Sequence, residues 1–370
     1  MNILHVNSYY IAAPLYKNLY DQQYKDMLQL EVYVPYNSKI KDIKKEFGKY
    51  TTLSNDFSTL DRAFFFRKHK KIFYNIEKKY DIKKFDIIHA HSLFSNGYIA
   101  YLLKKKYGTP YIVAVRNTDV NVFFKRMIHL RNLGNRIIEN AEKVIFISKP
   151  YKDIVINKYL NKYNQNYKKN FVVIPNGINE FWLNNIYTNR KKTKENSVNI
   201  LCVGDIDKNK NHLTTLRVCE RLKSEGIDIH FNIVGRVLDK SIYNKLSSNG
   251  LVNYLGTMKK ENLINVYRQN DIFIMPSFTE TFGLVYAEAM SQGVPVIYTK
   301  NQGFDQQFPE GLVGYHTDAD DVGCIYKNIH LILDNYDSIS QQCCVEARKF
   351  DWGNIAREYN EIYQKIIINS

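Results

Sequence analysis

The sequence has no long hydrophobic run and few cysteines. Within its 370 residues, no apolar stretch reaches the roughly 18 residues needed to span a bilayer. The first residues carry neither a positively charged stretch nor a small-residue cleavage site, so we expect no signal peptide. All five cysteines lie in the second half and none has metal-ligand spacing, which indicates reduced thiols in a cytosolic protein. These absences argue against a membrane-spanning protein and against a disulfide-stabilised one.

Internal repeats, low-complexity segments and nucleic-acid-binding motifs are also absent from the sequence. The main compositional feature is the uneven distribution of charge along the chain. Residues 1–185 hold 31 Lys and Arg against 15 Asp and Glu, whereas residues 186–370 hold 21 against 22. Much of the excess lies at residues 39–49, 62–71, 78–84 and 104–106. A basic half is attracted to anionic surfaces. We expect this half to rest on the inner face of a membrane and to bind no nucleic acid; the alternative is a soluble enzyme with solvated lysines.

The chain length and the alternation of short apolar runs with amphipathic stretches predict two α/β domains. Strands are expected at residues 3–6, 30–34, 87–90, 111–115, 144–147 and 172–174, and after a polar segment at 199–203, 230–234, 252–255, 272–275 and 294–298. Helices are expected between them, such as 98–106, 133–140, 213–224, 259–269 and 282–292, with a long amphipathic one at the end. Such a pattern indicates doubly wound parallel sheets, which bind ligands beyond the carboxyl ends of their strands.

The segment 276–297, PSFTETFGLVYAEAMSQGVPVI, places two carboxylates eight positions apart. Glu280 is expected in a turn, and Glu288 two turns into the following helix, about 12 Å further along. The helix N-terminus between them offers unpaired N–H groups and a partial positive charge, which suit a phosphate. This order fits a ligand with a sugar, a diphosphate and a ribose. The alternative is an acid near a helix start followed by a solvated helix charge.

The same segment resembles the signature of glycosyltransferase family 4, P-S-x-x-E-x-F-G-L-x-x-x-E-A-M, and keeps every fixed position of it. Residues 1–10, 85–92, 140–149, 174–178 and 203–212 and the terminal helix also look like segments of this family, in the same order. The resemblance implies a GT-B fold with two facing Rossmann-like domains. It implies an acceptor-side domain at residues 1–183, a linker at 184–197, a nucleotide-sugar donor domain at 198–348, and a helix at 349–370 that returns to the first domain.

By position, the resemblance also implies residue roles. Glu288 would bind the ribose hydroxyls, Glu280 the donor sugar, and Lys210 the diphosphate. The implied donor-binding residues are Gly204, Asp205, Lys210, Arg236, Thr281, Phe282, Gly283, Leu284 and Glu288, and the implied catalytic residues are Glu280, Lys210, Arg116 and Asp119. Gly204 would let the donor approach the backbone closely. Family members need no metal, so none is expected.

Three positions depart from the family pattern. The usual Gly-Arg is Gly204-Asp205 here, and we hypothesise that Arg236 supplies the missing cation. Arg116 stands where many members have a histidine, and it can bind phosphate or a hydroxyl but cannot act as a base. The loop at residues 8–16 lacks the usual glycines, which makes that side of the cleft bulkier.

Other chemistry-bearing residues have simpler interpretations. His89 and His91 share a strand face and suit hydrogen bonds at the strand end better than a metal. Asp318 and Asp320 imitate a D-x-D metal motif, but they precede a helical stretch and favour helix capping. Residues 301–305 follow a strand end and could touch the donor, the alternative being a turn.

The sequence therefore predicts a retaining glycosyltransferase that moves a sugar from a nucleotide-diphosphate sugar to a glycan or lipid-linked acceptor of surface polysaccharide synthesis. It is expected in the cytoplasm, peripheral on the inner membrane face. Two alternatives stay open: a GT-B-fold isomerase that acts on a nucleotide-sugar, and a non-catalytic sugar-binding partner subunit.

Overall fold

The structure is a computed structural model that describes residues 1–13, 15–40, 43, 45–160, 170–188, 190–192 and 196–369. Four predicted features lie partly outside the described residues: the basic segment 39–49 (at 41, 42 and 44), the linker (at 189 and 193–195), the glycine-free loop (at 14) and the C-terminal segment (at 370). The chain forms two compact units. One consists of residues 1–147, 151–176 and 352–370, and the other of residues 148–150 and 177–351.

The first unit is built on one parallel sheet with the strand order β3-β2-β1-β4-β5-β6-β7. The strands are β1 (Asn2–Val6), β2 (Gln29–Asn37), β3 (Thr51–Phe57), β4 (Ile87–Ala90), β5 (Tyr111–Val115), β6 (Lys143–Phe146) and β7 (Phe171–Val173). The helices are α1 (Leu15–Lys25), α2 (Phe65–Lys79), α3 (Ser95–Tyr107), α4 (Arg131–Asn140), α5 (Lys149–Lys158) and α13 (Trp352–Ile368), with short helical turns η1 (Leu60–Ala63), η2 (Ile82–Lys84), η3 (Asp119–Phe124) and η4 (Ile128–Leu130).

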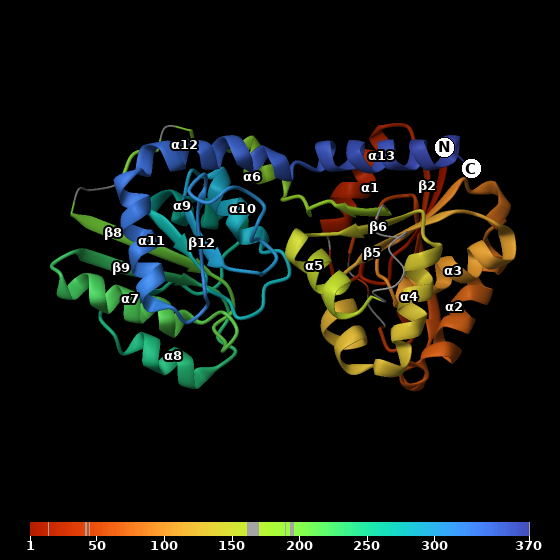
Figure 1. Ribbon diagram of the computed structural model, residues 1–370, viewed down its shortest axis with the longest axis horizontal. Coiled ribbons are helices and arrows are strands. Elements are labelled where there is room, and N and C mark those ends of the chain that lie inside the picture. Colours follow the sequence, from red (N-terminus) through yellow and green to blue (C-terminus); the bar gives the residue numbers. More distant parts are fainter. Residues whose placement is uncertain are drawn as a thin grey trace. The chain divides into compact units, whose positions relative to one another are not determined.

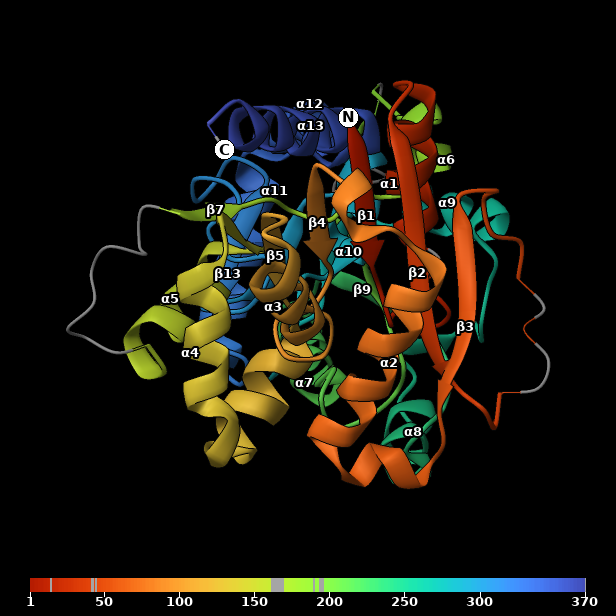
Figure 2. The same ribbon diagram turned by 90° about the vertical axis from the view of Figure 1, so that its right-hand side faces the viewer.

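Alternating strand side chains give this sheet a hydrophobic core on each face. On one face, Leu4 and Val6 of β1 belong to a cluster with residues of α2, α3 and α4, and Figure 2 shows these three helices together in front of the sheet. On the other face, Ile3 belongs to a cluster with residues of α1 and α13. Both faces of the sheet are therefore covered, as in a doubly wound fold.

The C-terminal helix α13 belongs to the first unit although the chain reaches it from the second. Trp352, Ile355, Tyr359 and Tyr363 form its buried stripe, with helical spacing. Figure 1 shows α13 beside α1, and the two helices share a hydrophobic cluster. The predicted return of the C-terminal helix to the first domain is confirmed.

The second unit holds a parallel sheet with the order β10-β9-β8-β11-β12-β13. Its strands are β8 (Ser197–Val203), β9 (Asp228–Val234), β10 (Val252–Tyr254), β11 (Ile272–Ile274), β12 (Val296–Thr299) and β13 (Gly314–Thr317). Its helices are α6 (Glu180–Asn184), α7 (His212–Ser224), α8 (Lys240–Ser247), α9 (Lys260–Gln269), α10 (Leu284–Ser291), α11 (Val322–Asp334) and α12 (Tyr336–Glu346), followed by η6 (Ala347–Phe350).

The two parallel sheets with covering helices confirm the predicted α/β class. Strands β3 and β13 were not predicted. Both lie at the edge of their sheets, where β3 reads TTLSNDF and β13 reads GYHT, so neither has the apolar run of an inner strand. In the part of the chain that the structure describes, no helix is both long and apolar enough to cross a bilayer.

Candidate functional site

The predicted donor residues gather where strands of the second sheet end. Gly204 directly follows β8, and its N–H donates to the carbonyl of Val234, the last residue of β9. A Cβ added to Gly204 would lie 3.3 Å from both the Lys210 Cε atom and the Met275 Sδ atom. Gly204 therefore leaves room for the Lys210 stem, in addition to the close donor approach that we predict for it.

Lys210 and Glu280, two residues assigned to the site from sequence, form an ion pair. Lys210 Nζ lies 2.7 Å from Glu280 Oε2, and only 21% and 13% of the two side chains are exposed. The other oxygen, Glu280 Oε1, accepts from the Thr281 N–H at 3.0 Å. The Lys210 backbone N–H donates to the Asp207 carboxylate at 2.9 Å. The loops after β8 and β11 are thus joined through two predicted site residues.

Asp205 and Arg236 form a second ion pair at the same sheet edge. Arg236 donates through Nε to Asp205 Oδ1 at 2.9 Å and through Nη2 to Oδ2 at 2.6 Å. This two-point contact holds the pKa of Asp205 below its usual value. Asp205, which replaces the usual family arginine, is therefore neutralised by Arg236, the residue that we hypothesise supplies the missing cation. The pair also fixes the direction of the guanidinium.

Gly283 sets the start of helix α10. Its φ of 78° is left-handed, and a Cβ would lie 2.5 Å from the Tyr286 ring. The helix consequently begins at Leu284 and not at residue 282, so the prediction that Glu288 lies two turns into the helix is wrong; it is the fifth helical residue. Among the hydrogen bonds of the described residues, none involves the N–H groups of Phe282, Gly283 or Leu284. The Phe282 side chain is buried, so the donor contact predicted for this residue would have to come from its backbone.

Glu288 is partly buried beside two aromatic residues. Tyr267 OH lies 3.4 Å from Glu288 Oε2. Burial disfavours the charged carboxylate and raises its pKa to about 7, while hydrogen bonds from Tyr267 and Trp182 act in the opposite direction. A solvated surface acid would keep its ordinary pKa, so the simple interpretation of Glu288 as a solvated helix charge does not fit.

Two residues that were not assigned from sequence support Glu280. The Asn209 side chain donates to the Thr279 carbonyl and accepts from the Thr279 N–H, each at 2.9 Å. Gln302 Oε1 accepts from the Glu280 N–H at 2.9 Å, and the Gly303 N–H donates to the Glu280 carbonyl at 2.8 Å. Residues 301–305, considered a donor contact or a turn, thus brace the Glu280 loop. The neighbouring Lys210 was the sequence signal that could have drawn attention to Asn209.

Arg116 and Asp119 lie in the first unit, at the carboxyl ends of β4 and β5. The Asp119 carboxylate is fully buried and accepts from the backbone N–H groups of Leu93, Phe94 and Arg116 at 2.8–3.0 Å. Burial raises its pKa to about 6. Arg116 donates to the His91 carbonyl and to the Asn176 side chain, each at 3.3 Å. Asp119 therefore holds the backbone of the segments that follow β4 and β5, whereas Arg116 places a positive charge near the ends of these strands.

His89 and His91 meet a third histidine, His5 of the neighbouring strand β1, and the three could hold a metal ion. His5 Nδ1 lies 3.0 Å from His91 Nε2, and His89 Nδ1 lies 2.6 Å from Tyr363 OH. Burial lowers the pKa of His5 to about 3 and holds the other two well below the usual value, with Arg116 as a further cause for both. A divalent cation would meet that same arginine charge, which disfavours a metal here. Each histidine has one ring nitrogen in a hydrogen bond and one buried ring nitrogen without a partner among the described residues.

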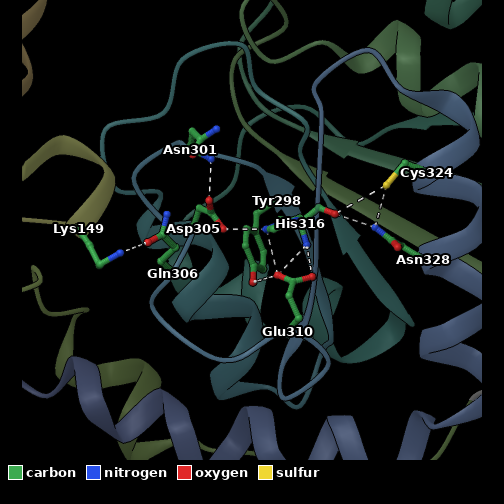
Figure 3. Close-up of polar contacts among 9 residues, drawn as sticks. All are labelled: Lys149, Tyr298, Asn301, Asp305, Gln306, Glu310, His316, Cys324 and Asn328. Carbon is green, nitrogen blue, oxygen red and sulfur yellow. Dashed lines mark hydrogen bonds and ion pairs between the residues drawn. The ribbon is translucent and has the colours of Figure 1, made fainter. Parts of the chain in front are cut away.

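A second group that could hold a metal is Asp305, Glu310 and His316, which point toward one another in Figure 3. His316 Nδ1 lies 3.0 Å from Asp305 Oδ1 and 3.2 Å from Glu310 Oε1. The Asn301 N–H donates to Asp305 at 2.7 Å, so these hydrogen bonds also explain the cluster as a brace of the loop after β12. Helix α11 is capped by Asp321, which accepts from the Cys324 N–H; capping by Asp318 or Asp320 was a wrong expectation.

Comparisons with known proteins agree with this arrangement. A family model described as glycosyl transferases group 1 matches residues 185–350, and one described as glycosyltransferase family 4 matches residues 32–180. An uncharacterized glycosyltransferase of Methanocaldococcus jannaschii is 25% identical over 288 residues, which is 76% of each chain. The solved sucrose-phosphate synthase from Thermosynechococcus elongatus shares the fold with a TM-score of 0.76 at 17% identity over 100% of both chains.

A solved Anabaena protein in complex with UDP has a TM-score of 0.69 at 15% identity, covering 98% of this chain and 99% of that one. The two family models together span most of the chain. The two solved structures have the same fold as this chain over nearly its whole length. The chain therefore belongs to the group 1 glycosyltransferases of glycosyltransferase family 4, and it is a glycosyltransferase with the GT-B fold.

Proposed function

We propose that this enzyme is a retaining glycosyltransferase that uses a nucleotide-diphosphate sugar and a glycan or lipid-linked acceptor. The observation that carries the proposal is the Lys210–Glu280 ion pair at the edge of a parallel sheet, next to the N-terminus of the helix that bears Glu288. Cation, carboxylate and helix N-terminus match the parts of such a donor. The Anabaena protein of the same fold binds UDP, which supports a nucleotide donor.

In the proposed mechanism, the bond between the anomeric carbon and the diphosphate breaks, and the acceptor hydroxyl oxygen bonds to that carbon from the same face of the sugar. The hydroxyl proton passes to the departing phosphate oxygen. Negative charge grows on the leaving diphosphate, where Lys210, Arg236 and the N–H groups of residues 282–284 would stabilise it without a metal. Glu280 would orient the sugar, Glu288 the ribose, and Thr281 would line the donor. Asp205 would position Arg236, Asp119 would position Arg116, and Arg116 would face the acceptor side.

Slow donor hydrolysis tests this mechanism without a known acceptor. The first sugar released, observed by NMR, should keep the anomeric configuration of the donor; an inverted product contradicts a retaining mechanism. Lys210→Ala should slow the reaction by roughly 100- to 1000-fold, since one fixed stabilising contact of the leaving group is lost. Lys208→Ala is the matched control, because this exposed lysine of the same loop has no assigned role.

A further inference from the structure

Two segments of the first unit expose large apolar side chains. Leu60, Phe64 and Phe66 are 79%, 60% and 55% exposed, and Ile128 is 64% exposed. The first three belong to η1, the residue after it and the start of α2, and Ile128 begins η4. A soluble monomer seldom gathers so many large apolar side chains on one surface.

The two segments form one surface. The ring centroids of Phe65 and Phe123 lie 6.0 Å apart, so the segments pack together. A groove of about 460 Å³ is lined by residues of both, including Phe64, Phe66 and Met127. We call residues 60–71 and 123–131 the apolar–basic patch.

The charge of this patch is strongly positive. It holds eight Lys and Arg residues and one acid, Asp61. Asp61 is 1% exposed and turned inward, where it pairs with Arg67 at 3.1 Å and Lys71 at 2.8 Å. Arg62, Lys70 and Arg126 are exposed, and the one acid of the patch, Asp61, is paired with Arg67 and Lys71.

We propose that the apolar–basic patch docks on a bilayer that contains anionic phospholipid. Exposed aromatic and aliphatic side chains enter the boundary between headgroups and acyl chains, while the surrounding basic residues contact the anionic headgroups. Nucleic acid would match the charge but offers no apolar phase for Leu60 and Ile128. A second copy of the chain, joined through the same patch, would bring two positive surfaces together. Docking on a bilayer would require neither donor binding nor glycosyl transfer.

Co-sedimentation with vesicles tests the proposal on the full chain, without donor or acceptor. The protein should bind vesicles of phosphatidylcholine with phosphatidylglycerol, bind vesicles of phosphatidylcholine alone far more weakly, and lose affinity as salt is added. Arg62→Gln/Lys70→Gln/Arg126→Gln should weaken binding about 100-fold, at about fivefold per basic residue. Leu60→Ser/Phe64→Ser/Ile128→Ser should weaken it on the order of tenfold or more.

Control variants replace three exposed basic residues and two exposed apolar residues of the second unit. Lys240→Gln/Lys245→Gln/Lys327→Gln and Leu238→Ser/Val345→Ser should bind vesicles like the unchanged protein. The proposal is overturned if both patch variants bind anionic vesicles as tightly as the unchanged protein does. It is also overturned if the unchanged protein does not bind anionic vesicles. Self-association in solution that the Leu60→Ser/Phe64→Ser/Ile128→Ser variant abolishes would assign the patch to a second copy and overturn it too.

Discussion

At the residue scale, Glu288 gives the site a pH dependence. Its pKa of about 7 means that the carboxyl gains its charge as pH rises through neutrality. A charged carboxylate accepts hydrogen bonds from ribose hydroxyls more strongly than a neutral acid does. We therefore expect affinity for a nucleotide-sugar to rise between about pH 6 and pH 8.

Calorimetric titration at several pH values measures this effect, because the diphosphate of a nucleotide-sugar does not itself titrate there. Glu288→Gln should bind more weakly and show no rise. An affinity of the unchanged enzyme that stays flat across the interval contradicts the assignment of Glu288 to the ribose.

Because Asp205 and Arg236 form an ion pair, we expect their substitutions to have non-additive effects on donor affinity. Arg236→Ala removes a cation and leaves the Asp205 carboxylate unpaired where the donor diphosphate is placed, so donor affinity should fall by about tenfold to 100-fold. Asp205→Asn in the Arg236→Ala background should restore part of the loss.

Donor affinities of the two single variants and the double variant complete this test. Arg221→Ala is the control, because Arg221 also pairs with an acid, Glu225, but near the end of α7. If Arg236→Ala binds donor like the unchanged enzyme, Arg236 does not replace the missing family cation.

At the element scale, Asp119 ties the turn after β5 to the start of α3. Asp119→Ala would leave three backbone N–H groups without their buried acceptor, and the free energy of unfolding should fall by about 3 kcal/mol or more. Urea unfolding measures this fall. Asp119→Asn keeps the shape and one acceptor oxygen and should lose less. An Ala variant as stable as the unchanged protein would show that these contacts contribute little.

Gly283 links the start of α10 to donor binding. Gly283→Ala should be less stable than Gly108→Ala, although both residues have φ near 80°, because only at Gly283 would the Cβ meet a neighbouring side chain. The Gly108 change should cost about 1 kcal/mol. Donor affinity should fall only in the Gly283 variant, since the N–H groups of residues 282–284 would shift. Equal stability and equal affinity of the two variants contradict this role.

The inner strands and helices such as α3, α7 and α9 could be predicted because their apolar side chains recur with the period of a buried element. The edge strands β3 and β13 lack that run and were not predicted. The spacing of Glu280 and Glu288 pointed to the proposed donor site from sequence alone. The sequence suggested only that Arg236 supplies the missing cation; its contact with Asp205 was not predicted, because it joins residues 31 positions apart across two strand ends. The three backbone hydrogen bonds of Asp119 could not be predicted from the sequence, because two of them join it to residues 25 and 26 positions away.

At the scale of the whole molecule, we propose that the second unit binds the donor and that the first unit docks on lipid through the apolar–basic patch. The two units have parallel sheets of the same class but different charged residues. The excess of basic residues lies in the first half of the chain, and the Lys210–Glu280 ion pair lies in the second half. The return of α13 to the first unit makes the chain's last segment part of that unit's core.

The central claim is that a nucleotide-sugar binds at Lys210, Glu280 and Glu288. A thermal-shift screen against UDP-, GDP-, ADP- and CDP-sugars tests it most directly. At least one nucleotide class should raise the melting temperature of the unchanged enzyme, as expected for a ligand that binds only the folded state. The Lys210→Ala and Glu288→Gln variants should lose that rise, while Lys208→Ala keeps it. Failure of every nucleotide-sugar to stabilise the folded enzyme, or an undiminished shift in both site variants, would contradict the claim.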